Sequence, residues 1–66
     1  MKIGELARLS GVTIDTIRFY EREGLLPAPL RTPSGYREFS AETLGRLSFI
    51  KRARELGFRL DEIGEL

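Results

Sequence analysis

The sequence predicts a mainly α fold with four helices and one small two-stranded hairpin. Three observations indicate this fold. Apolar residues recur three positions apart in four stretches of the chain, as they do in helices that bury one face. A glycine follows each of the first three stretches, where a helix commonly ends. Three prolines between residues 27 and 33 interrupt the helical pattern, so this part of the chain is expected to form a connector and the hairpin.

A helix-turn-helix is predicted over about residues 4–23. Its first helix, over residues 4–10, is followed by a Ser-Gly-Val turn, and its second helix has a face rich in hydrogen-bonding groups. Two helices in this arrangement place the second one in the major groove of DNA. A plain helical corner has the same sequence pattern and stays an alternative. The buried stripe of the first helix is expected at Ile3, Leu6, Ala7 and Leu9.

The second helix is expected to begin after Thr13, whose hydroxyl can cap it, and to end at Gly24 in a left-handed conformation. Ile17 and Tyr20 are expected to face the core, although the Tyr20 hydroxyl could also act at the surface. Arg18 follows the inward Ile17 and therefore projects to the side. Its planar guanidinium is suited to bind a phosphate or a guanine edge.

A two-stranded hairpin is predicted over about residues 30–39. Pro27 and Pro29 keep the segment before it extended, and the Pro-Ser-Gly sequence at 33–35 predicts its turn. A two-stranded hairpin is not stable alone, so it is expected to pack on the helices. A hairpin that packs beside a helix-turn-helix is a wing.

The exposed basic groups of this wing are Arg31 and Arg37. They are expected to reach the DNA backbone or the minor groove beside the groove that the second helix occupies. Arg37 could instead pair with a carboxylate such as Glu38 or Glu42, an exposed contact of about 0 to 1 kcal/mol.

The third helix is expected over residues 41–56, with Ser40 as its N-cap and Gly57 after its end. A short fourth helix is expected over residues 60–66, with Arg59 at a position where a capping oxygen would be usual. The apolar stripe of the third helix, which is expected to be the main core element, comprises Leu44, Leu47, Ile50, Ala53 and Leu56. Four basic residues lie outside this stripe, and most are expected to be solvated with at least one near a phosphate: Arg46, Lys51, Arg52 and Arg54.

The composition argues against an enzyme. The 66 residues form one small domain, 1–66, and include no cysteine and no histidine. The commonest catalytic nucleophile, the commonest general base and the best transition-metal ligands are therefore missing, and we expect no cofactor or metal. The sequence contains no membrane-span-length apolar run and does not begin with a signal peptide, so we expect a cytoplasmic protein without a membrane partner.

The charge is unevenly distributed, although the net charge is only +1. Residues 31–59 carry seven basic and three acidic side chains, whereas residues 60–66 carry three acidic and no basic ones. A basic segment beside a polar-faced helix is expected of a domain that binds a phosphate backbone. A solvated charged face is the commoner explanation of scattered arginines and stays an alternative.

Five blocks occur in a characteristic order without gaps. They are Met-Lys-Ile-Gly-Glu-Leu-Ala at 1–7, Thr-Ile-Arg-Phe-Tyr-Glu at 16–21, Gly-Leu-Leu-Pro at 24–27, Arg-Thr-Pro-Ser-Gly-Tyr-Arg at 31–37 and Phe-Ile-Lys-Arg-Ala-Arg-Glu-Leu-Gly-Phe at 49–58. Together they resemble the N-terminal domain of the MerR family of bacterial transcription regulators. This resemblance implies a winged helix-turn-helix that binds one half of a pseudopalindromic promoter operator as a homodimer. Family members distort the promoter so that RNA polymerase can engage both of its recognition elements.

The resemblance also implies a set of DNA contacts. Asp15 is the least expected of them, since an acid repels phosphate unless it accepts a hydrogen bond from a cytosine amino group. The residues of the second helix are Thr13, Asp15, Thr16, Arg18, Phe19 and Tyr20, and those of the wing are Arg31, Tyr36 and Arg37.

Family members continue into a long dimerisation helix and an effector site, whereas this chain stops at Leu66. We therefore expect either an isolated domain or a small protein, associated with the bacterial nucleoid, whose dimer is weak or absent. An excisionase-like protein that bends DNA is an alternative function. A protein-interaction module that uses its aromatic and arginine face is another.

Overall fold

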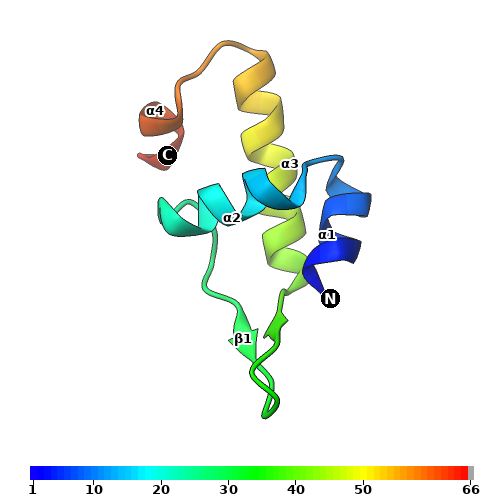
Figure 1. Cartoon of the computed structure of the whole chain (residues 1–66). Coiled ribbons are helices and arrows are strands. Elements are labelled where there is room, and N and C mark those ends of the chain that lie inside the picture. Colours follow the sequence, from blue (N-terminus) through cyan, green and yellow to red (C-terminus); the bar gives the residue numbers. More distant parts are fainter. Residues whose placement is uncertain (66) are drawn as a thin grey trace.

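The computed structural model describes residues 1–65 and contains, over that range, four helices and one antiparallel two-stranded hairpin (Figure 1). The elements are α1 (Ile3–Ser10), α2 (Ile14–Arg22), β1 (Leu30–Arg31), β2 (Arg37–Glu38), α3 (Ala41–Glu55) and α4 (Leu60–Gly64). The predicted mainly α fold is confirmed. The predicted fourth helix extended to Leu66, which lies outside the described residues. None of the helices within residues 1–65 has the length and apolar character needed to cross a membrane.

The longest helix, α3, organises the domain. Helix α1 packs against both α2 and α3, and α4 packs against α3 near its C-terminal end (Figure 1). The hairpin projects from the opposite end, where α3 begins, so the molecule is elongated, with extents of 39 × 21 × 19 Å. The core is formed by Leu6, Ile17, Leu26, Phe39, Leu47, Ile50, Ala53 and Ile63.

Two leucines predicted in the buried stripes are exposed, and this part of the prediction was wrong. Leu56 is 66% exposed, because α3 ends at Glu55 and the chain turns away at residues 56 and 57. Leu9 is exposed as well, because the buried positions of α1 are Leu6 and Ser10. On α3 the buried line begins instead at Thr43, which is 1% exposed and lies one helical turn before Leu47. Leu44 is only partly buried.

The predicted start of α2 is confirmed by its capping geometry. The Thr16 backbone N–H donates to Thr13 Oγ1 at 3.2 Å, and Gly24 follows the helix with a φ of +73°. Ser40 occupies the predicted N-cap position of α3 in an extended conformation. Its backbone carbonyl accepts a 3.1 Å hydrogen bond from the Thr43 N–H, whereas the expected side-chain cap is not formed.

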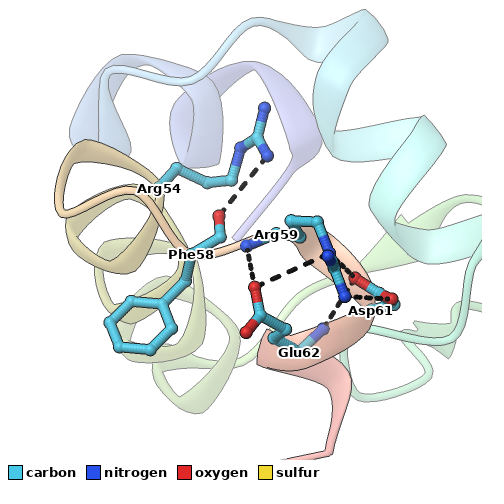
Figure 2. A network of polar contacts seen from close by, with 5 residues as sticks. All are labelled: Arg54, Phe58, Arg59, Asp61 and Glu62. Atoms are coloured by element: carbon cyan, nitrogen blue, oxygen red, sulfur yellow. Dashed lines mark hydrogen bonds and ion pairs between the residues drawn. The ribbon is translucent and has the colours of Figure 1, made fainter.

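Helix α4 begins in a network of carboxylates around Arg59 (Figure 2). An arginine has no acceptor with which to cap a helix. Glu62 Oε1 accepts from the Arg59 backbone N–H at 2.9 Å, and Asp61 Oδ1 accepts from the Glu62 N–H at 3.0 Å. The Arg59 guanidinium donates to both Asp61 carboxylate oxygens, at 3.1 and 3.3 Å, and thereby lowers the pKa of Asp61. These acids supply the acceptors that the sequence suggested were missing at residue 59.

Arg46 links three parts of the fold, although most of the four basic residues of α3 outside the apolar stripe were predicted to be solvated. Its Nε donates to the Leu25 carbonyl at 3.1 Å, and its Nη2 donates to the Ile63 carbonyl at 3.4 Å. Its guanidinium also lies 5.1 Å from the centre of the Phe49 ring. Arg46 therefore connects the segment after α2 with the end of α4.

The first residue pairs with the end of β2. The Phe39 N–H donates to the Met1 carbonyl at 2.7 Å, and the Met1 ammonium donates to the Phe39 carbonyl at 2.6 Å. The same ammonium donates to Glu38 Oε1 at 2.8 Å, and Lys2 Nζ lies 3.3 Å from Glu38 Oε2. The hydrogen bonds from Met1 and then from Lys2 lower the pKa of the Glu38 carboxyl.

The substitution Leu47→Ala should lower the free energy of unfolding by about 2 to 5 kcal/mol, because it leaves a cavity beside α3 in a small core. Leu56→Ala removes the same atoms from the exposed end of the helix and should change stability by less than about 0.5 kcal/mol. Urea unfolding of both variants measures the difference. Equal losses would contradict the observed burial.

The substitution Glu38→Gln should remove a pH-dependent part of the stability. The folded-state pKa of Glu38 lies below its ordinary value of 4.5. Its ionised form therefore stabilises the fold above pH 4.5, and this contribution is lost as the pH falls through the lower folded-state pKa. The wild type should be more stable than the variant near neutral pH and equally stable in strong acid. Urea unfolding of both proteins over this range tests it, and a stability difference that is the same near neutral pH and in strong acid would contradict the prediction.

Candidate nucleic-acid interface

A basic groove of about 600 Å³ lies between α2 and the hairpin, and we call it the wing groove. It brings together four of the nine predicted contact residues from distant parts of the chain, one from α2 and three from the hairpin. It is lined by Lys2, Ile3, Arg18, Arg31, Gly35, Tyr36 and Arg37. Four of these seven residues carry positive charge, so the groove is suited to anions.

The hairpin owes its shape to a tight turn. The Thr32 N–H donates to the Tyr36 carbonyl at 2.8 Å, and the Gly35 N–H donates to the Thr32 carbonyl at 2.8 Å. Gly35 has a φ of +84°, a conformation that side chains disfavour. Arg31 Nη1 donates to the Gly35 carbonyl at 3.2 Å, which holds this guanidinium over the turn.

Arg37 forms an ion pair with α2. Its Nε lies 3.4 Å from Glu21 Oε1. Glu38 and Glu42 were the alternative partners of Arg37 suggested from the sequence, and among the described residues Arg37 pairs with Glu21 instead. Glu38 follows Arg37 in β2, so it points to the opposite face of the hairpin, where it meets Met1 and Lys2.

A second hollow of about 470 Å³ lies on the other side of α2, and we call it the α3 groove. It contains three other predicted contact residues, Thr13, Thr16 and Tyr20. Lys51 and Arg54 of α3 line it as well, and the remaining lining residues are Gly11, Val12 and Glu55. Tyr20 also packs against the core, so the structure places it in both of the positions considered from the sequence.

The last two predicted residues, Asp15 and Phe19, lie on the exposed outer face of α2 between the grooves, one helical turn apart. The Arg22 guanidinium is 5.9 Å from the centre of the Phe19 ring. We call Asp15, Phe19 and Arg22 the outer ridge. The nine predicted residues are thus spread over the wing groove, the outer ridge and the α3 groove.

Lys2 and Glu21 contact predicted DNA-facing side chains, and the sequence did not point to either residue. Lys2 reaches the wing groove because Met1 is paired with Phe39, and its Nζ lies 5.2 Å from the centre of the Tyr36 ring. Neither the Lys2–Tyr36 contact nor the Glu21–Arg37 contact could be predicted from nearby residues in the sequence. In the part of the chain that the structure describes, no three His, Cys, Asp or Glu side chains gather so that they could hold a metal ion.

Helix α2 is exposed and lies between two grooves that are lined with basic side chains, so it is suited to enter the major groove of DNA. The DNA major groove is about 12 Å wide and accepts one α-helix, with a phosphate backbone on each side. The family comparison supports this interpretation, because residues 1–66 match the family described as MerR HTH family regulatory protein. The chain belongs to the MerR family. The resemblance seen in the five sequence blocks is therefore confirmed.

Named members of the MerR family are similar over the whole length of this chain. It is 58% identical over 65 residues to the mercuric resistance operon regulatory protein of Bacillus cereus, which covers 98% of this chain and 49% of that protein. It is 50% identical over 66 residues to the HTH-type transcriptional regulator ZntR homolog of Haemophilus influenzae, covering 100% of this chain and 49% of that protein. The chain spans about half the length of these curated relatives.

Solved MerR-family structures share the fold. The transcription regulator PbrR691 from Ralstonia metallidurans CH34, in complex with lead(II), superposes with a TM-score of 0.92 at 45% identity, over 98% of this chain and 51% of that one. HiNmlR, a MerR family regulator lacking the sensor domain and bound to promoter DNA, gives a TM-score of 0.89 at 32% identity, over 98% and 49%. The predicted winged helix-turn-helix is therefore confirmed, with β1 and β2 as the wing.

The substitution Gly11→Ala should destabilise the domain by about 1 to 2 kcal/mol, because Gly11 has a φ of +73°. A Cβ atom there would also lie 2.8 Å from Lys51 Nζ, which would have to move in the α3 groove. Gly4→Ala is the matched control, since no described atom beyond its chain neighbours and its own helix backbone lies within 4 Å of its Cβ position, and it should stabilise α1 by about 0.5 to 1 kcal/mol. Thermal or urea unfolding measures both. A loss of stability in both variants would contradict this account.

Proposed function

We propose that this domain binds double-stranded promoter DNA in a sequence-specific manner, as the DNA-binding part of a MerR-type transcriptional regulator. The observation that carries the proposal is the convergence of Arg18 from α2 with Arg31 and Arg37 from the hairpin on the wing groove. Guanidinium groups bind phosphates and guanine edges with paired hydrogen bonds. Helix α2 then occupies the major groove, and the wing lies on the adjacent backbone.

Each part of the surface has its own role in this proposal. The outer ridge faces the base edges, where Asp15 can accept from a cytosine amino group and Phe19 can contact a thymine methyl group. The wing groove and the α3 groove face the two phosphate backbones and set the orientation of α2. Tyr36 at the rim of the wing groove adds a phenolic donor to the backbone contacts.

One domain covers half of an operator in this proposal, and a homodimer of the whole regulator covers a pseudopalindrome. The promoter complex of HiNmlR supports DNA as the partner. By analogy with the MerR family, the bound dimer distorts the promoter and acts on RNA polymerase indirectly. We place this activity in the cytoplasm, at the bacterial nucleoid.

We also propose that the domain acts by binding alone, without catalysis, cofactor or metal. The support is chemical, since the sequence offers no thiol or imidazole. Its relatives are named as regulators. Any signal would then be received outside these 66 residues.

A titration against a palindromic promoter fragment, a single half-site and unrelated DNA at two salt concentrations tests the proposal. We expect tighter binding to the palindrome than to unrelated DNA, and a steep loss of affinity with salt as phosphate counterions return. Bending of every fragment without preference would support the excisionase-like alternative instead. A folded domain that binds no DNA would contradict the proposal. The protein-interaction module would then be the remaining alternative function.

The substitution Arg18→Ala should weaken operator binding by about 1 to 3 kcal/mol, because it removes a side chain that contacts base edges or a phosphate. Arg52→Ala is the matched control, since Arg52 is an exposed arginine of α3 outside the residues that line either groove. It should leave the preference for the operator unchanged. The measurement is fluorescence anisotropy with operator and unrelated DNA, and an unaffected operator affinity of a folded Arg18→Ala variant would remove Arg18 from the site.

A further inference from the structure

The ion pair between Glu21 and Arg37 joins the two DNA-facing elements directly. Glu21 is the last residue but one of α2, and Arg37 begins β2. Their side chains are 19% and 38% exposed, with Glu21 Oε1 and Arg37 Nε 3.4 Å apart. This contact connects α2, which faces the bases in the proposed complex, to the wing, which faces the DNA backbone.

The pair is poorly arranged to stabilise the fold. Arg37 Nε and Glu21 Oε2 are both shielded from solvent and have no hydrogen-bond partner among the described residues. A shielded ionic group that lacks hydrogen bonds loses hydration without full compensation. We therefore expect the pair to add little to the free energy of folding.

The surroundings of Arg37 explain what the acid does. Arg37 lies directly opposite Arg31 in the hairpin register, and Arg18 lines the same groove. Like charges that face each other across a strand pair repel. The Glu21 carboxylate counteracts this repulsion from the α2 side and holds the Arg37 guanidinium near the helix. The other guanidinium nitrogens of Arg37 stay available to a phosphate.

We propose that Glu21 is a positioning residue of the DNA interface, which fixes Arg37 relative to α2 and so improves discrimination between operator and unrelated DNA. This inference rests on the proposed function. Backbone contacts set the register in which a recognition helix meets the bases. A fixed Arg37 allows the base contacts and the backbone contacts to form together on the operator. On unrelated DNA no base contacts depend on this register, so a loosened Arg37 costs less there.

The experiment compares Glu21→Gln with Glu23→Gln. Both changes remove one negative charge from the C-terminal end of α2, but Glu23 is exposed and lies outside the Arg37 contact. Each variant is titrated with operator and unrelated DNA by fluorescence anisotropy. We expect both changes to alter the affinity for unrelated DNA only slightly. Only Glu21→Gln should lower the ratio of operator to unrelated affinity, by about 3- to 10-fold.

A double-mutant cycle tests whether Glu21 acts through Arg37. In an Arg37→Gln background, Glu21→Gln should have no further effect on the affinity ratio. An equal effect in both backgrounds would overturn the proposal. So would identical ratios for Glu21→Gln and Glu23→Gln.

NMR of the Arg37 Nε–H in the free domain gives a measurement that does not depend on DNA binding or on folding of the variants. In the wild type this proton should exchange with water more slowly than that of the exposed Arg52. Exchange as fast as that of Arg52 would overturn the positioning role, even if the domain binds DNA. Slow exchange in a domain that binds no DNA would instead overturn the proposed function, while the contact that holds Arg37 in place would stand.

Discussion

The position of Phe39 is the constraint on which the rest of this domain depends. Its ring is buried in the core between the hairpin and α3, and its backbone is paired with Met1 in both directions. A hairpin with two residues per strand has too few hydrogen bonds to fix its own orientation. Phe39 supplies that orientation, because one residue anchors the end of β2, the start of α3 and the beginning of the chain. This anchor, together with the Glu21–Arg37 contact, holds the hairpin beside α2 and so forms the wing groove.

Polar contacts connect parts of the fold that the small core alone does not join. Among residues 1–65, eight buried apolar side chains form the core, and they leave α4 and the hairpin at opposite ends of an elongated molecule. Arg46 joins the segment after α2 to the end of α4 through two backbone carbonyls. Glu21 and Arg37 join α2 to the wing at the other end. Half-buried charged side chains therefore connect α2 to the wing, and the segment after α2 to α4.

The sequence predicted what depends on neighbours along the chain. The Thr13 cap, the left-handed Gly24, the inward Ile17 and the hairpin turn follow from local spacing and residue type, and the structure contains all of them. The predicted burial of Leu56 was wrong because periodicity alone does not determine the residue at which a helix ends. Arg46 and the partner of Arg37 could not be predicted, since each contact joins residues more than ten positions apart and depends on how the elements pack. The nine candidate contact residues all lie on or beside α2. Their division into the wing groove, the outer ridge and the α3 groove could be seen only in the structure.

The outer ridge contributes nothing to the core. Asp15, Phe19 and Arg22 are exposed, so most exchanges among polar and apolar residues there should cost little folding stability. The residues that orient α2 lie elsewhere, at Phe39, Arg46 and Glu21. Under the proposed function, base preference at the outer ridge can therefore change with little effect on folding. In evolutionary terms, a lineage built on this scaffold could then acquire new target sequences by drift at the ridge alone.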